Sequence, residues 1–176
     1  MDTNKAKEVA IECALEAGKL LTDNFEKIKK VSFKAVGDIV TNVDDESEEL
    51  IIKKIKANFP DHSILSEEAG MEDNSSEYLW LLDPLDGTAT YSCGNSPFRV
   101  IIALLHKGEP IISAIYNPVK DDLYLAVKGE GATLNGKKIT VTDNSELRNF
   151  LLLVHLSSKE DARLRVLKIL NDLIKN

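Results

Sequence analysis

Two carboxylates lie three residues apart in the segment 82–88, Leu-Asp-Pro-Leu-Asp-Gly-Thr, directly after a run of apolar residues. An unpaired charge beside a buried strand is costly unless a cation compensates it. The side chains of Asp83 and Asp86 and the carbonyl of Leu85 supply hard oxygen ligands, the type that magnesium prefers. Gly87 lets backbone amides approach an anion, and a short helix starting after it would offer free N–H groups to a phosphate. The segment predicts a divalent cation site next to an anion.

Other acidic residues could complete such a site. The pair Glu67-Glu68 follows an apolar run, and Asp38 and Asp44 bracket the segment 37–44. One metal ion needs two or three oxygen ligands, and a two-metal site needs four or more. A single acidic residue is more often a solvated charge or a helix cap. We interpret one acidic block as such a solvated helix face: Asp45, Glu46, Glu48 and Glu49.

A covalent phosphoenzyme is the rival interpretation of the same segment. Haloacid-dehalogenase-type phosphatases carry D-x-D-G-T after a strand, and the first Asp of that motif becomes phosphorylated. Here Leu85 stands at the position of that nucleophile, because the two aspartates are three residues apart. The spacing disfavours an aspartyl-phosphate, although Asp83 stays open as a nucleophile.

Composition limits the partners of the chain. Its 176 residues include 22 basic and 29 acidic residues, a net charge of −7 that repels phosphate backbones and anionic lipid. We therefore expect no nucleic acid and no membrane partner. Since the sequence has neither an apolar run of about 20 residues nor a signal peptide, we expect a cytoplasmic protein. Cys13 and Cys93 form no C-x-x-C pair, and His62, His106 and His155 are too scattered to predict a ligand set.

Helical spacing marks the first third of the chain. Apolar residues recur at three- and four-residue steps from Ala6 to Ile28, which predicts a long helix with Cys13 on its buried side. A second helix is expected to begin near Asp44 or Asp45, where acidic residues suit the positive end of the helix dipole. Pro60 ends it.

Short apolar runs follow and predict strands. The turns between them are short, so neighbouring strands should be antiparallel. A further strand at 150–154 is expected to lead through Ser157-Ser158-Lys159-Glu160, a capping-box pattern, into a last amphipathic helix. We predict one α+β domain over residues 1–176, with helices layered on a largely antiparallel sheet. Besides 150–154, the apolar runs that predict strands are 63–65, 78–82, 100–105, 111–116 and 123–127, with a weaker pair flanking Asn135-Gly136.

Two of these runs have few polar residues. Residues 78–82 and 150–154 are nearly continuous apolar runs, which is typical of strands covered on both faces. Few helices follow them in the sequence, so we expect an exposed apolar face on the chain.

Four motifs in order resemble the inositol monophosphatase family, the magnesium-dependent, lithium-sensitive sugar phosphatases that include archaeal fructose-1,6-bisphosphatases. The resemblance implies the sugar-phosphatase fold, a homodimer and hydrolysis of a small phosphorylated alcohol or sugar. Inositol-1-phosphate is the first candidate substrate and fructose-1,6-bisphosphate the second. The motifs are the segments 37–44, 59–68, 80–88 and 128–137.

Carried over residue by residue, the resemblance implies a set of Mg²⁺ ligands. Glu67, Asp83 and the Leu85 carbonyl correspond to the ligands of a first metal ion. Asp83 and Asp86 correspond to part of a second metal site, and a third, weaker magnesium would also use Glu67.

The resemblance also implies catalytic and substrate-binding roles. Thr88 and Asp44 correspond to the hydrogen-bonded pair that, with Glu67, orients and deprotonates a metal-bound water. That water attacks the phosphate monoester in line. The amides of Gly87 and Thr88 resemble the phosphate cradle, and Asp86 is the third residue expected at the substrate.

The chain also departs from the family pattern. Family members carry a W-D-x-A-A-G motif in a second half, and its Asp completes the second metal site, but no Trp follows Trp80 here. The chain therefore corresponds to the N-terminal part of the fold and should lack its C-terminal α/β half. Thr90 and Cys93 replace an Asn and a His or Arg of the family. The alternative function is a truncated, weakly active or inactive member that binds metal and phosphate and acts as an interaction module.

Overall fold

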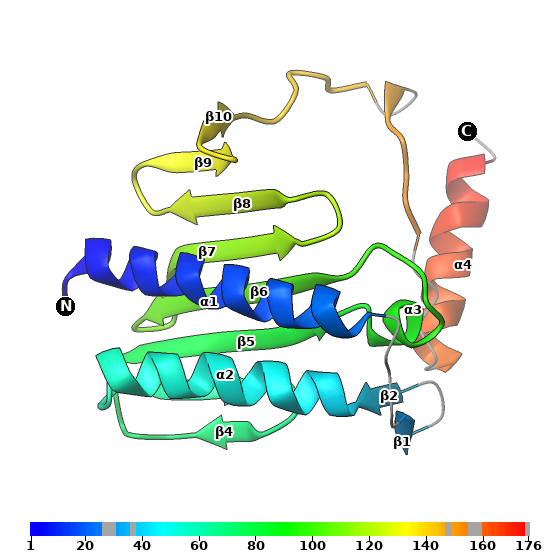
Figure 1. The fold of residues 1–176 in the computed structure, drawn as a ribbon. Helices are drawn as coiled ribbons and strands as arrows, with labels where there is room; N and C mark the ends of the chain where they lie inside the picture. Colours follow the sequence, from blue (N-terminus) through cyan, green and yellow to red (C-terminus); the bar gives the residue numbers. More distant parts are fainter. Residues whose placement is uncertain (26–30, 36–37, 147–148, 155–159, 175–176) are drawn as a thin grey trace.

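The computed structural model describes residues 1–25, 31–35, 38–146, 149–154 and 160–174. Within these residues, two long helices cover one face of an eight-stranded sheet, and a two-stranded hairpin precedes the second helix (Figure 1). The hairpin consists of β1 (Val31–Ala35) and β2 (Asp38–Thr41), neither of which was expected from the sequence. The arrangement of helices on a mostly antiparallel sheet confirms the predicted α+β class.

Helix α1 (Thr3–Asn24) packs through small residues. Asp2 caps it by accepting a hydrogen bond from the amide of Asn4 at 2.9 Å. Cys13 is fully buried on its inner face, as predicted. A Cβ at Gly18 would lie 2.4 Å from the ring of Tyr116, so glycine is needed for this close approach to β7. Ile28, which we placed on the same stripe, lies outside the described residues.

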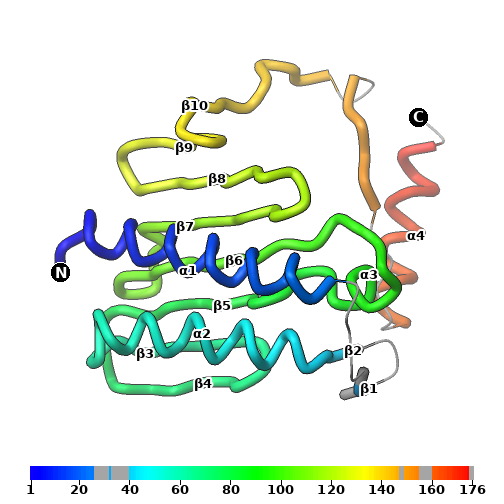
Figure 2. Tube along the Cα trace, viewed as in Figure 1, coloured from blue at the N-terminus to red at the C-terminus, as the bar shows by residue number. Residues whose placement is uncertain are grey.

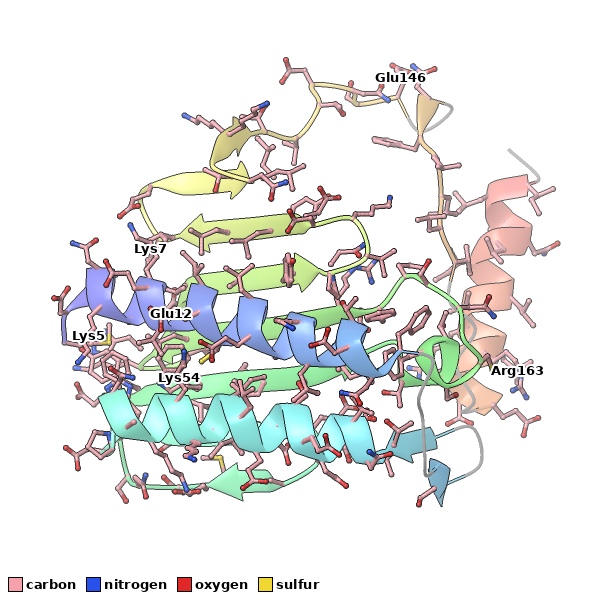
Figure 3. All side chains as sticks on the ribbon, in the orientation of Figure 1. Lys5, Lys7, Glu12, Lys54, Glu146 and Arg163 are labelled. Atoms are coloured by element: carbon pink, nitrogen blue, oxygen red, sulfur yellow. The ribbon has the colours of Figure 1, made fainter. Side chains whose placement is uncertain are left out.

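Helix α2 (Asn42–Asn58) begins earlier than expected. Its N-cap is Thr41, and Asp44 is the third helical residue, whose side chain accepts the Thr41 N–H in a capping box. The start expected near Asp44 or Asp45 is two to three residues late, and both aspartates lie in the first turn, where their charge suits the helix dipole. As predicted, the helix ends just before Pro60. Figure 3 shows Lys54 of α2 directed toward α1, where its Nζ lies 3.1 Å from Glu12 Oε2.

The sheet has the strand order β10-β9-β8-β7-β6-β5-β3-β4. All neighbours are antiparallel except β3 and β5, which run parallel. Every strand predicted between residues 63 and 139 is present, and the short β4 is additional. The bounds are β3 (Ser63–Ser66), β4 (Gly70–Glu72), β5 (Tyr78–Asp86), β6 (Arg99–His106), β7 (Glu109–Asn117), β8 (Asp122–Val127), β9 (Gly131–Leu134) and β10 (Lys137–Ile139).

The core lies between the two helices and one face of the sheet. Trp80, Val100, Ile102 and Leu104 are fully buried there, whereas their strand neighbours on the other face are only half-buried. The run 78–82 is therefore covered on one face within the described residues, not on both as predicted.

The chain after β10 leaves the sheet (Figure 2). Residues 150–154 form no strand, and Leu151 and Leu153 are 88% and 87% exposed. The predicted strand is wrong because apolar content alone does not make a strand, whose N–H and C=O groups need a paired neighbour. Helix α4 (Glu160–Ile174) is present, but it buries none of its residues. Residues 157–159 of the predicted capping box lie outside the described residues.

No helix in the described ranges combines the length and the apolar character that a membrane span requires.

Candidate active site

A bulge at the end of β5 places two aspartates on one face of the sheet. Residues three apart on a regular strand point to opposite faces. Here Asp83 pairs with Ile101 and Asp86 pairs with Arg99, so three steps along β5 match two along β6. The extra residue brings the side chains of Asp83 and Asp86 to the same face. Pro84, which has no N–H to donate, is tolerated in this central strand because it lies in the bulge.

Glu67 joins the site through the parallel pairing of β3 with β5. Ser66 is the register partner of Leu82, so Glu67, the first residue after β3, follows next to Asp83 of β5. The amide of Glu67 donates to the Leu82 carbonyl at 3.2 Å, which holds the two strand ends together. Two acidic residues 16 positions apart in the sequence thus become neighbours.

The Asp83 carboxyl lies among other carboxylates, and a backbone hydrogen bond with Leu85 offsets their effect only in part. Burial, the charge of Glu67 and a hydrogen bond with it, and the charge of Asp86 raise the pKa of Asp83 to about 7. Asp83 Oδ1 is buried and has no hydrogen-bond partner among the described residues. A buried oxygen that faces other carboxylates without a donor is an environment that a cation would stabilise, so these residues fit a divalent metal ion.

The carboxylates do not all converge on one point. In the described part of the chain, no three His, Cys, Asp or Glu side chains are grouped as ligands of one ion. Asp86 is turned toward Arg99, whose Nη1 donates to Asp86 Oδ2 at 2.9 Å. The oxygens left for a metal are those of Glu67 and Asp83 and the carbonyl of Leu85.

Thr88 and Asp44 are joined by a hydrogen bond across two elements. Thr88 Oγ1 lies 2.9 Å from Asp44 Oδ1 and 2.9 Å from the Leu85 carbonyl, and its single proton can go to either acceptor. Asp44 is buried, and its Oδ2 accepts the Thr41 N–H at 2.8 Å. The capping box of α2 therefore fixes the carboxylate that Thr88 contacts.

Gly87 connects the bulge to a short helix, α3 (Thr88–Ser92). Its φ of +95° is in the left-handed region, and a Cβ there would lie 3.1 Å from the Pro97 carbonyl. The helix begins at Thr88, directly after Gly87, which is the arrangement considered from the sequence. The N–H groups at this helix start belong to the residues expected to hold phosphate.

Glu48 is a positioning residue that the sequence analysis missed. We took it for part of a solvated helix face, but it is 7% exposed, and its Oε1 accepts the amides of Glu68 at 3.1 Å and Ala69 at 3.0 Å. It holds the loop that follows Glu67. Helical spacing could have identified it, because Glu48 lies three and seven residues before the buried Ile51 and Ile55.

The remaining candidate residues lie away from this site or outside the described residues. Cys93 is exposed at the end of α3. His62 and His106 stack on the two faces of Tyr78, at the opposite end of β5 from Asp86, with centroid distances of 4.8 and 4.5 Å. The backbone of Asp38 belongs to β2. His155 lies outside the described residues.

Comparison with known proteins identifies relatives. The profile of the inositol monophosphatase family matches residues 2–174. A fructose-1,6-bisphosphatase/inositol-1-monophosphatase from Aquifex aeolicus is 46% identical over 147 residues, which are 82% of this chain and 56% of that protein. A Nus factor SuhB from Haemophilus influenzae is 37% identical over 152 residues, 85% of this chain and 57% of that protein. The chain thus spans little more than half the length of these relatives.

Solved structures are similar in fold. An inositol monophosphatase from Anabaena has 36% sequence identity and a TM-score of 0.70, covering 83% of this chain and 53% of that one. The IMPase of Thermotoga maritima has 31% identity and a TM-score of 0.74, covering 82% and 55%. An IMPase/NADP phosphatase complexed with Mg²⁺ and phosphate has 29% identity and a TM-score of 0.61, covering 70% and 48%.

Proposed function

Since the chain belongs to the inositol monophosphatase family, we propose that it hydrolyses phosphate monoesters of small alcohols or sugars with bound Mg²⁺. Inositol-1-phosphate is the first candidate substrate and fructose-1,6-bisphosphate the second. The name of the Aquifex aeolicus relative, which covers both activities, supports this choice. The Mg²⁺ and phosphate in the structurally similar IMPase/NADP phosphatase support the cofactor.

The environment of Asp83 is the observation that carries the proposal. Its Oδ1 is buried without a partner, and burial and the neighbouring carboxylates raise its pKa to about 7. Glu67, Asp83 and the Leu85 carbonyl would hold Mg²⁺, and Asp86 would contribute to a second metal site and to substrate binding. When bound, Mg²⁺ supplies electrostatic stabilisation of the attacking and leaving oxygens of an in-line displacement.

Thr88, Asp44 and Glu67 would position the attacking water. Donation from Thr88 Oγ1 to Asp44 Oδ1 at 2.9 Å leaves the lone pairs of the hydroxyl free to accept a hydrogen bond from that water. The carboxylate of Glu67, at the exposed end of β3, would accept its proton. Because Asp44 is held by Thr41, the acceptor that would orient the Thr88 hydroxyl is in place before substrate binds.

The start of α3 would bind the phosphate. Gly87 adopts a left-handed φ and has no Cβ, so phosphate oxygens could approach the amides of Gly87 and Thr88 closely. These donors would bind the phosphoryl group common to both candidate substrates, so they do not distinguish inositol from sugar.

Phosphate release from inositol-1-phosphate by the purified chain, in millimolar Mg²⁺, tests the proposal. Asp83→Asn removes the buried charge, and we expect at least a roughly 100-fold loss of kcat/KM, the usual size for a preorganised electrostatic contact. Asp143→Asn is the matched control, because Asp143 is exposed in the segment after β10. Lithium should inhibit the reaction. Metal binding without turnover would instead support an interaction module, and equal activity of Asp83→Asn and wild type would contradict the proposal.

A further inference from the structure

The pairing of β5 with β6 places Arg99 next to the candidate metal site. It is the first residue of β6 and the register partner of Asp86, the last residue of β5. Its Nη1 lies 2.9 Å from Asp86 Oδ2, and the two side chains are 40% and 38% exposed. Directly paired positions keep side chains adjacent, so this ion pair is set by the fold rather than by a chance meeting of two long surface side chains.

The charges around Asp83 suggest what the ion pair does. Glu67, Asp83 and Asp86 carry three negative charges when ionised, and the guanidinium of Arg99 balances one of them. A divalent ion that uses Asp86 would therefore meet the positive charge of Arg99. A guanidinium does not lose its proton in proteins, so this positive charge is permanent.

We propose that Arg99 is a built-in cation that competes with a second divalent ion for the Asp86 carboxylate and so weakens the binding of that ion. The inference rests on the proposed function, because it concerns the same carboxylates. The geometry supports it: Asp86 lies on the same face as Asp83, yet its Oδ2 is bonded to Arg99. A second ion that uses Asp86 must compete with the guanidinium.

The number of bound Mn²⁺ ions per chain, counted by electron paramagnetic resonance of free Mn²⁺, tests the inference. Wild type should bind one ion in the sub-millimolar range. Arg99→Gln removes the charge and keeps a side chain of similar length, and it should bind a second ion roughly fivefold more tightly than wild type does, the scale of a partly exposed ion pair. Arg99→Lys keeps the charge and should match wild type, and it also controls for folding.

The double variant Arg99→Gln/Asp86→Asn should lose the second ion, because the released carboxylate is what binds it. If Arg99→Gln binds the same number of ions with the same affinities as wild type, the inference is wrong and the proposed function stands. If neither protein binds Mn²⁺, both are wrong. A second ion in Arg99→Gln that persists without the Asp86 carboxylate would also overturn the inference.

Discussion

At the scale of single residues, Asp83 has the least favourable environment in the site. It lies in β5 next to Glu67 and Asp86, and one of its oxygens is buried without a donor. A residue in this position destabilises the metal-free fold when it is ionised, because burial and like charges both oppose the charged form. The same features favour the binding of a cation, which would supply the missing positive charge.

The pH dependence of stability follows from the raised pKa of Asp83. An ordinary Asp ionises near 3.8, and Asp83 in the fold ionises near 7, so the folded chain binds more protons between these values. The stability of the metal-free protein should therefore fall as the pH rises from 4 to 7, as far as Asp83 contributes. Asp83→Asn removes this loss and should be more stable than wild type at pH 8, by on the order of 2 kcal/mol.

Urea unfolding of wild type and Asp83→Asn in EDTA, at a series of pH values, measures this difference. The gap between the two proteins should close toward pH 4, where the wild-type carboxyl is protonated in the fold. Added Mg²⁺ should stabilise wild type more than the variant. Parallel stability curves for the two proteins at all pH values would contradict the raised pKa.

The Thr88 hydroxyl is the second residue that can be tested singly. Thr88→Val keeps the shape of the side chain but removes the donor to Asp44 Oδ1, so we expect a roughly 100-fold lower kcat, typical of losing a general acid–base contact. Thr88→Ser keeps the hydroxyl and should retain most of the activity. Stability of Thr88→Val should fall by only about 1 kcal/mol, which urea unfolding would show. Equal kcat for Val and Ser variants would rule out a role for the hydroxyl.

At the scale of elements, three local devices hold the site. The capping box of α2 fixes Asp44, the bulge in β5 brings Asp83 and Asp86 to one face, and the Ser47 hydroxyl donates to the Pro84 carbonyl at 3.1 Å. This last bond joins α2 directly to the bulge. The helix and the strand end therefore carry the site as one unit.

Glu48 provides a test of how α2 positions the loop after β3. Glu48→Ala leaves the amides of Glu68 and Ala69 without their acceptor and should cost about 1.5–3 kcal/mol, the range for hydrogen bonds to a charged group. Glu49→Ala, at the next and exposed position of the same helix, should change stability by less than about 0.5 kcal/mol. Guanidinium unfolding of both variants would show the contrast. Equal effects would mean that Glu48 is not a loop anchor.

At the scale of the whole molecule, apolar surface is exposed where the chain leaves the sheet. Leu151, Leu153, Leu164 and Ile169 are exposed by more than half, and α4 buries none of its residues. One face of the sheet is also only half-buried. Several exposed apolar side chains of this kind are typical of an interface, either with another part of a protein or with a second copy.

We expect the isolated chain to bind a hydrophobic dye and to self-associate. Leu151→Ser combined with Leu153→Ser should lower dye fluorescence, because both side chains are almost fully exposed. Sedimentation velocity gives the size in solution, with a dimer as the expected species. A monomer that binds no dye would contradict this prediction.

Sequence alone was enough for the features that depend on neighbouring residues. The helix stripes, the turns and the apolar runs predicted α1, α2 and every strand from β3 to β10 except the short β4. The candidate site was also largely visible, because Asp83, Asp86, Gly87 and Thr88 are close together in the sequence. Glu67 and Asp44 were candidates among several acidic residues, and their roles came from the family resemblance.

Tertiary structure decided the features that depend on register and packing between distant segments. The amides that Glu48 binds, the ion pair of Arg99 with Asp86 and the absence of a strand at 150–154 could not be derived locally. A carboxylate's partner depends on which strand lies beside it, and an apolar run becomes a strand only where another strand pairs with its backbone. These choices are made between residues far apart in the chain, so composition and spacing do not contain them.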